Sequence, residues 1–272
     1  MIAAHYSRLD RALHRMAFAS NVVQDVLADV EASLYRKQLE AIGVARPIFI
    51  TSLPRAGTTL VLELLANHPD TGSHTYRDMP FVRAPALWQS LAGSFRTAAA
   101  KAERAHGDGL MIDYDSPEGL EEVVWMRAFP GDFAGDGIAL SRATGDEVRA
   151  ALEGHIRRVL LARQRDGGPA LRYLSKNNAN VARIPALRAA FPRAIVLVPL
   201  RDPLEHARSL QRQYLRFAEA HGSEPFALRY MRDIGHFEFG ELHRPIRFPR
   251  APDAPESGPE ALDYWLGYWI AA

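Results

Sequence analysis

Residues 47–67 read PIFITSLPRAGTTLVLELLAN, and this stretch decides the fold class. Its first part, 47–52, is a short apolar run rich in β-forming residues and bounded by prolines, which is typical of a buried strand. A tight turn follows at 54–57 because proline and glycine stand together there. Residues 58–67 are so apolar that they predict a helix packed on most of its sides.

The segments around this stretch repeat the alternation of strands and helices. Residues 7–40 carry the apolar stripe of a helix, and a capping box at Thr144 and Glu147 opens another helix that runs to about Arg165. Strands are predicted at 171–174 and 194–200, with a helix between them. Such alternation predicts an α/β fold in which helices cover both faces of a parallel sheet, giving three α/β/α layers.

The last of these strands is followed directly by a helix start. Asp202 is placed as the N-cap, and Pro203 takes the first helical position, where its missing N–H costs nothing.

Composition limits the classes of protein that need to be considered. The 272 residues hold 33 Lys+Arg against 32 Asp+Glu and no cysteine. Balanced charge gives no reason to expect a nucleic acid or a membrane as partner, and a chain without cysteine has no disulfide, thiolate catalyst or Cys-ligated metal. No signal peptide or transmembrane stretch is evident, so we expect a cytoplasmic protein.

We expect a single domain over 1–272, since one domain of this size is common. Within it, residues 1–46 form an N-terminal helical extension and 245–259 a proline-rich loop. Residues 263–270 form an aromatic segment that is expected to be helical, and the chain ends directly after it at Ala272.

Three cations follow the predicted strands. Arg55, Lys176 and Arg201 each stand at or just after a strand end, and Lys176 is one of only three lysines. In a parallel sheet the carboxyl ends of the strands meet at one edge, and ligands bind there. The sequence therefore predicts the functional site at this edge.

The turn after the first strand has the chemistry of a phosphate cradle. Gly57 lets the backbone approach an anion, and the free N–H groups at the helix start point toward it. Thr58 and Thr59 add hydroxyl donors, and the Arg55 guanidinium matches a tetrahedral oxyanion. The turn is not a Walker A motif, which requires an earlier glycine and a lysine.

The segment Pro54-Arg55-Ala56-Gly57-Thr58-Thr59 resembles the 5′-phosphosulfate loop of sulfotransferases that use 3′-phosphoadenosine 5′-phosphosulfate (PAPS). Members of this family also carry an arginine at the end of a later strand and a serine eight residues further on, which bind the 3′-phosphate of the donor. Arg201 and Ser209 match this pair. The resemblance covers roughly residues 1–245 and extends to bacterial, cytosolic and tyrosylprotein sulfotransferases.

The resemblance implies a PAPS-dependent sulfotransferase that moves a sulfuryl group onto an acceptor hydroxyl, with a three-layer α/β/α fold whose parallel sheet is like that of P-loop NTPases. PAPS would be the co-substrate, and no metal is expected. The donor-binding residues that it implies are Arg55, Ala56, Gly57, Thr58, Thr59, Arg201 and Ser209.

Lys176 is the candidate electrostatic catalyst. In the sulfotransferases that this chain resembles, a lysine after a middle strand points into the active site, and Lys176 follows such a strand in Ser175-Lys176-Asn177-Asn178. Sulfuryl transfer, like phosphoryl transfer, needs cations and N–H donors rather than a covalent nucleophile. The alternative is a surface lysine in a polar turn.

The base that takes the acceptor proton is expected just after the loop helix. Cytosolic sulfotransferases use a histidine, and His74 is the first candidate because imidazole titrates near neutrality. Asp78 is the second, and the alternative for His74 is a turn histidine with a solvent partner. If His74 is the base, the His74→Ala variant is expected to show a kcat about 10²–10⁴-fold lower, with its affinity for the donor unchanged. An unchanged rate would move the role to Asp78.

A group of carboxylates at 118–122 is interpreted as an ordinary helix start. Ser116 would be the N-cap and Pro117 the first helical residue, with acids in the first turn. No metal site is therefore expected there.

Two other functions remain open. A P-loop kinase or NTPase-like phosphotransferase would need magnesium and a Walker lysine, and a degenerate, non-catalytic nucleotide-binding relative would need neither. The end of the chain supports the degenerate relative. Members of the family continue beyond the aromatic helix, so we expect this sequence to be either a fragment or a shortened domain. The acceptor could be a small-molecule, carbohydrate or peptide hydroxyl, and the sequence does not indicate the oligomeric state.

Overall fold

The computed structural model describes residues 7–92, 102–103, 111–164, 168, 171–249 and 257–272. Residues 1–6 of the predicted N-terminal extension and 250–256 of the predicted proline-rich loop lie outside the described residues. The helices and strands, in chain order, are α1 (Arg8–Ala17), α2 (Asn21–Leu34), α3 (Arg36–Ala41), β1 (Ile48–Ile50), α4 (Thr58–Ala66), β2 (Thr71–Gly72), η2 (Tyr76–Asp78), α5 (Pro85–Ala92), β3 (Ala102–Glu103), β4 (Met111–Ile112), α6 (Glu122–Ala128), η3 (Pro130–Phe133), α7 (Gly145–Arg163), β5 (Arg172–Lys176), η4 (Asn178–Arg183), α8 (Ile184–Ala190), β6 (Ile195–Leu197), α9 (Pro203–Ser223), α10 (Pro225–Asp233), η5 (Gly240–Leu242) and α11 (Leu262–Ala271).

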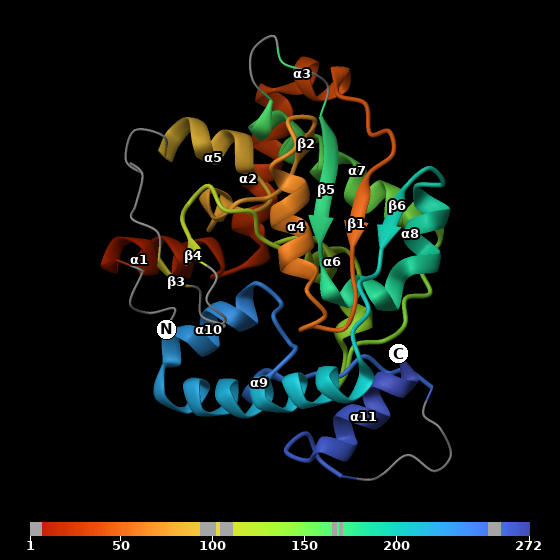
Figure 1. Cartoon of the computed structure of the whole chain (residues 1–272). Helices are drawn as coiled ribbons and strands as arrows, with labels where there is room; N and C mark the ends of the chain where they lie inside the picture. The colour runs from red at the N-terminus through yellow and green to blue at the C-terminus, as the bar shows by residue number, and fades with distance from the viewer. Residues whose placement is uncertain (1–6, 93–101, 104–110, 165–167, 169–170, 250–256) are drawn as a thin grey trace.

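The centre of the fold is a four-stranded sheet in the order β2-β5-β1-β6, with every neighbouring pair parallel. β1 lies between β5 and β6, so that Ile48 pairs with Leu174 on one side and with Ile195 on the other. The arrows of β1, β5 and β6 in Figure 1 run in one direction, and their carboxyl ends meet at the lower edge of the sheet. This confirms the predicted α/β class with a parallel sheet.

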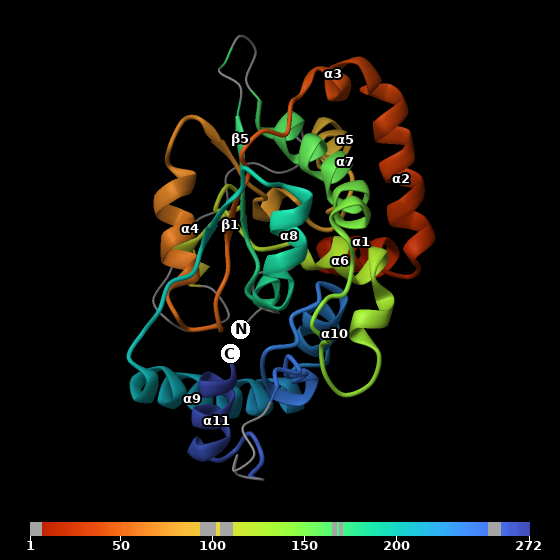
Figure 2. The same ribbon diagram turned by 90° about the vertical axis from the view of Figure 1, so that its right-hand side faces the viewer.

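Helices cover both faces of the sheet, as Figure 2 shows with α4 on one side and α7 and α8 on the other. The alternation of side chains along β1 supplies both cores. Phe49 packs with Leu152 and Leu187 of the α7–α8 layer, whereas Ile48 and Ile50 pack with the α4 layer. The predicted three layers are therefore present.

The prediction that residues 58–67 are packed on most sides is wrong. Leu62 of α4 is 1% exposed, but Leu60 is 64% and Leu64 71% exposed. The reason is that α4 forms an outer layer, and within the described residues only its sheet-facing side is covered.

The predicted continuous helix at 7–40 is three helices. Ser20 has extended backbone angles ahead of α2, and Tyr35 leaves the helical region between α2 and α3. Two buried polar side chains fix α2 in place: Gln24 donates to the Pro80 carbonyl at 2.8 Å, and Glu31 accepts from the Leu87 amide at 2.6 Å.

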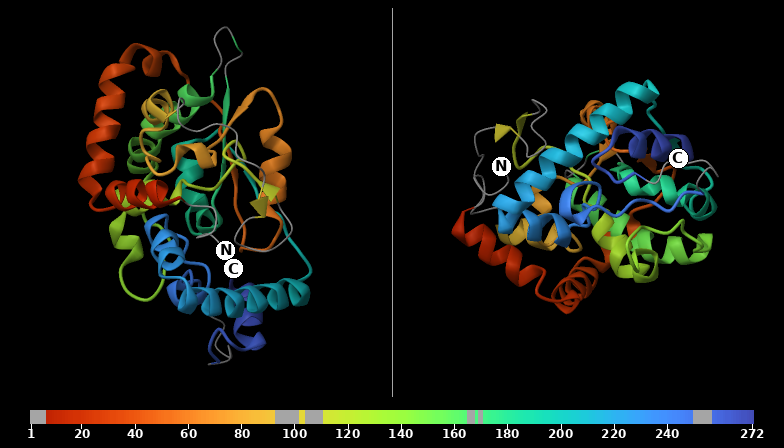
Figure 3. Two further views of the ribbon diagram at one scale, coloured as in Figure 1. Left: turned by 90° about the vertical axis from the view of Figure 1, so that its left-hand side faces the viewer. Right: turned by 90° about the horizontal axis from the view of Figure 1, so that it is seen from below.

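A second group of helices lies across the carboxyl edge of the sheet. α9 runs beneath the strand ends with α11 against it, which is plain when the molecule is seen from below (Figure 3). Their shared core is rich in aromatic residues, including Phe217, Phe239 and the fully buried Trp265. The carboxyl ends of the strands therefore face α9.

The described part of the chain has no helix with the length and apolar character that crossing a membrane requires.

Candidate active site

The loop between β1 and α4 has the shape of an anion cradle. Two of its residues, Arg55 (φ 71°) and Gly57 (φ 95°), take the left-handed conformation. The first hydrogen bond of the helix runs from the Val61 amide to the Gly57 carbonyl at 3.2 Å, so the helix begins at the loop. A Cβ added at Gly57 would meet nothing within 4 Å. Glycine is required there by the backbone angle, and the space in front of the loop is open to a ligand.

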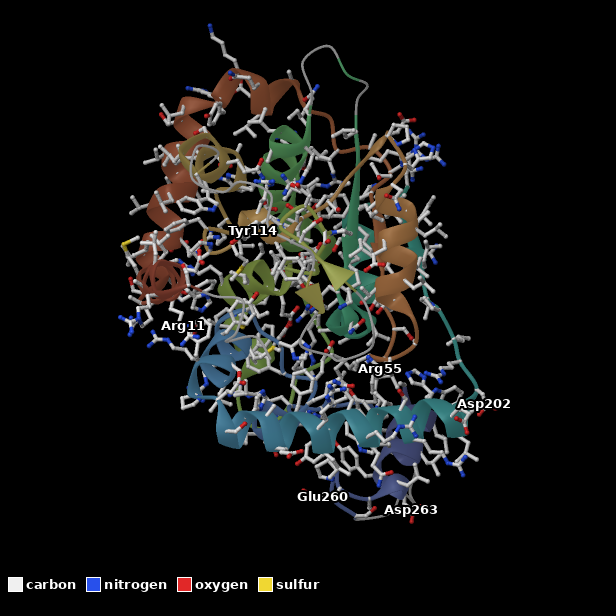
Figure 4. The ribbon with its side chains drawn as sticks, turned by 60° about the vertical axis from the view of Figure 1, so that its left-hand side comes forward. Arg11, Arg55, Tyr114, Asp202, Glu260 and Asp263 are labelled. Carbon is white, nitrogen blue, oxygen red and sulfur yellow. The ribbon has the colours of Figure 1, made fainter. Side chains whose placement is uncertain are left out.

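The structure brings together the two sequence motifs that were predicted to bind the donor. The Arg55 Nε donates to the Ser209 Oγ at 3.4 Å, and an Arg201 Nη donates to the Arg55 carbonyl at 3.3 Å. Asp202 caps α9 by accepting from the Glu205 amide at 2.9 Å, which places Ser209 on the buried side of that helix. Figure 4 shows Arg55 directly above α9, with Asp202 at the start of the helix. The guanidinium groups of Arg55 and Arg201 and the hydroxyl of Ser209 thus lie together at one loop.

The loop is supported from below by two residues that sequence reasoning missed. Trp269 donates its indole N–H to the Nδ1 of His206 at 3.1 Å, so the proton of a neutral His206 ring lies on Nε2, which donates to the Pro54 carbonyl at 2.8 Å. Burial lowers the pKa of His206, and the cations Arg201 and Arg55 lower it further. A neutral imidazole is what this chain of hydrogen bonds requires.

Lys176, the third predicted cation, is the last residue of β5 and lies at the same edge as the loop. The turn that follows it is bonded to the loop through Asn178. Thr51 donates to the Asn178 carbonyl at 3.1 Å, and Thr58 donates to its side-chain oxygen at 3.0 Å. Lys176 also passes close to Gly119, where an added Cβ would lie 2.4 Å from the lysine carbonyl oxygen and 3.0 Å from its Cδ.

A buried ion pair holds this turn from the other side. Arg183, which is 0% exposed, donates both Nη groups to Glu122 at 2.6 and 2.8 Å, and Asn177 donates to the same carboxylate at 2.6 Å. The guanidinium also lies over the Trp125 ring, 4.5 Å from its centroid.

The predicted helix start at Ser116 is wrong, since α6 begins at Glu122 and residue 117 instead bridges to Thr75. The acids of this region serve the core rather than a helix terminus: Glu121 accepts from Trp125, Tyr173 and Asn180 inside the protein. Among the residues that the structure describes, no group of three or more His, Cys, Asp or Glu side chains is arranged to hold a metal ion.

The two predicted bases, His74 and Asp78, lie together in a buried network. The Asp78 carboxylate accepts from His74 Nδ1 at 2.6 Å and from Arg163 at 2.5 and 2.6 Å. Burial alone would raise the pKa of Asp78, but Arg163 and His74 outweigh it and hold that pKa well below its usual range. The Nε2 of His74 faces the Nε2 of His155 at 2.8 Å. Both ring nitrogens of His74 are therefore occupied, and its catalytic role stays a prediction.

A further carboxylate lies at the site, and no motif in the sequence predicts it. Glu238 lies between α10 and η5 and accepts from the Asn178 side chain at 2.5 Å. Its other oxygen is 2.9 Å from His236 Nε2. Glu238 and His236 lie within residues 214–260, a part of the sequence that contains no recognisable motif. Only the contacts in the folded structure identify them as part of the site.

The fold and the site define an α/β protein with a cationic, cradle-shaped loop at the carboxyl ends of its parallel strands. The model of the sulfotransferase family matches residues 47–238, which include the loop, Lys176, Arg201 and Ser209. The chain belongs to the sulfotransferase family.

Two solved structures resemble the chain at low identity. Sulfotransferase STF1 from Mycobacterium tuberculosis H37Rv is 18% identical, with a TM-score of 0.47 over 76% of this chain and 59% of that one. Sulfotransferase STF9 from Mycobacterium avium is 16% identical, with a TM-score of 0.45 over 86% of this chain and 67% of that one. The chain thus spans less than two thirds of the length of STF1. No curated protein matches it.

Proposed function

We propose that this protein is a PAPS-dependent sulfotransferase that transfers a sulfuryl group to an acceptor hydroxyl. The observation that carries the proposal is that Arg201 and Ser209 both contact Arg55 of the loop. Arg201 and Ser209 are 146 and 154 positions away from Arg55 in the sequence. A nucleotide with an anion at each end of its ribose requires such a site, with charge at two places. The membership of the chain in the sulfotransferase family supports the same reaction class.

Each residue of the site has a role in this proposal. Arg55, Ala56, Gly57, Thr58 and Thr59 hold the 5′-phosphosulfate at the start of α4, where helix amides favour an anion. Arg201 and Ser209 hold the 3′-phosphate.

Lys176 supplies positive charge beside the loop, where charge develops on the bridging oxygen during transfer. The residues of the loop provide cations and N–H donors, which is what a loose, in-line transfer needs. The N-terminal helices belong to the same proposed domain because Gln24 is bonded to Pro80 and Glu31 is bonded to Leu87 of α5.

Isothermal titration calorimetry with 3′,5′-adenosine bisphosphate, the product nucleotide, tests the proposal. We expect micromolar binding that is lost in Arg201→Ala and Ser209→Ala. Arg188→Ala is the matched control, since Arg188 is an exposed arginine on α8 and outside the site. ATP with magnesium is titrated in parallel because a kinase or NTPase would prefer it.

Preference for ATP would refute the sulfotransferase assignment. Binding of neither nucleotide would favour a non-catalytic relative, and equal binding of the bisphosphate by all variants would refute the assigned donor residues.

A further inference from the structure

Glu238 lies where the donor loop, the turn after β5 and the segment after α10 meet. A pocket at this junction is lined by Leu53 and Pro54 from the loop, by Asn177 and Asn178 from the turn, and by Glu238. The Glu238 side chain is 22% exposed and borders this pocket.

Two hydrogen bonds connect this carboxylate to the start of α4. Asn178 donates its amide to Glu238 at 2.5 Å and accepts the hydroxyl of Thr58 at 3.0 Å on its carbonyl oxygen. Because Thr58 is the first residue of the helix that forms the anion cradle, Glu238 is held at a fixed position relative to the bound donor.

The charges around Glu238 keep it ionised. Burial would raise its pKa, but His236, Lys176 and the Asn178 amide together hold that pKa well below its usual range. His236 contacts only one of the two carboxylate oxygens, at 2.9 Å, and Asn178 contacts the other. A carboxylate oxygen accepts more than one hydrogen bond, so each oxygen keeps capacity for an acceptor hydroxyl.

His74 offers no such capacity. It is 3% exposed, its Nδ1 is bonded to Asp78, and its Nε2 faces His155. Burial holds the pKa of His155 well below its usual value, so His155 is neutral and a proton on its Nε2 can occupy the lone pair of His74. An acceptor hydroxyl would have to displace His155 from His74 before His74 could take the proton of that hydroxyl.

We propose that Glu238 is the catalytic base of this protein and that His236 is a positioning residue for it; this inference rests on the proposed sulfotransferase function. The acceptor oxygen forms a bond to sulfur while the bond between sulfur and the bridging oxygen of the donor breaks. The acceptor proton passes to a Glu238 oxygen, and the electron pair of the broken bond stays on the leaving phosphate. The proton then leaves Glu238 for solvent, which restores the carboxylate.

The test uses Glu238→Gln, which keeps the size of the side chain and removes its charge. With radiolabelled PAPS and water as the acceptor, we expect sulfate release to fall by about 10²-fold. This is the lower end of the contribution of a general base, because a carboxylate whose pKa is held below its usual range is a weak base. The affinity for 3′,5′-adenosine bisphosphate is expected to stay the same. Glu241→Gln, the same substitution at an exposed residue of η5, is the matched control and should release sulfate at the normal rate.

An equilibrium measurement separates a catalytic role from a structural one. Sulfate titrated into the complex with the bisphosphate should bind more tightly to Glu238→Gln, because the carboxylate no longer repels an anion in the transfer position. Glu238→Asp, which keeps the charge, should not show this gain. If Glu238→Gln fails to fold, as judged by circular dichroism, Glu238→Asp replaces it. The shorter aspartate side chain moves the carboxylate away from the acceptor, so this variant is expected to retain bisphosphate binding and to lose most sulfate release.

Sulfate release at the wild-type rate in Glu238→Gln would overturn the inference and leave the proposed function standing. Wild-type protein that binds the bisphosphate but releases no sulfate would also overturn it. Failure of the wild-type protein to bind the bisphosphate would instead refute the proposed function itself. His74→Asn serves as the comparison: a large loss of sulfate release confined to that variant, with its fold and its affinity for the bisphosphate intact, would return the role to His74.

Discussion

The buried pair of Glu122 and Arg183 is expected to be the most sensitive ionic contact near the site. In Glu122→Gln the Arg183 guanidinium stays fully buried, keeps its place over Trp125, and loses its counter-charge. Breaking one side of a buried ion pair costs about 3–5 kcal/mol because the remaining charge is left without compensation. The aromatic ring and the remaining amide oxygen of glutamine favour the lower end of this range.

A loss of about 3 kcal/mol lowers the Tm of a protein of this size by roughly 6–12 °C. Differential scanning calorimetry measures this shift directly. The control is Glu40→Gln: Glu40 pairs with Arg36, but their side chains are 65% and 78% exposed. An exposed pair contributes about 0–1 kcal/mol, so this variant should melt close to wild type.

A double variant identifies the cause. In Glu122→Gln with Arg183→Met, glutamine still accepts from Asn177 and no unpaired charge remains, so most of the lost stability should return. Equal Tm shifts for Glu122→Gln and Glu40→Gln would refute the reasoning. A double variant as unstable as the single one would show that packing, and not charge, sets the effect.

Two further predictions concern crowding and pH. Gly119→Ala places a methyl against Lys176 and should lower the free energy of unfolding by about 1–3 kcal/mol and slow PAPS turnover, whereas Gly131→Ala, which meets nothing within 4 Å, should do neither. Burial raises the pKa of Glu31 to about 7, so its charge destabilises the folded protein as the pH rises from about 4.5 through 7. Glu31→Gln should therefore raise the free energy of unfolding by up to about 3 kcal/mol at pH 8 and by less than about 1 kcal/mol at pH 5, as measured by urea unfolding. An equal gain at pH 5 and pH 8 would contradict the raised pKa of Glu31.

The parts of the fold that the sequence predicts are those with strong local signals. β1, the turn at 54–57 and the start of α9 at Pro203 each carry an apolar run, a glycine or a capping pair within a few residues. The break at 18–20 has no such signal, because the apolar stripe continues on a slightly rotated face and periodicity alone does not detect a turn between two helices.

The site divides in the same way. Arg55 and Arg201 could be placed at one edge from topology alone, since parallel strands end together. The contacts of His206 with Trp269 and of Asn178 with Glu238 join positions 63 and 60 residues apart. Neither contact leaves a pattern in the sequence, because a single side chain on a helix or in a loop has no periodicity to read.

The left-handed backbone of Arg55 has a consequence for engineering this protein. A residue with a Cβ in that conformation costs about 1–2 kcal/mol, and the loop retains arginine there at φ 71°. Glycine or asparagine would relieve the strain and remove the cation at the same time. A library screened only for heat resistance is therefore expected to enrich these residues at position 55 and to select proteins that lack the arginine of the proposed donor site. Directed evolution of this protein has to select for activity and heat resistance in the same round.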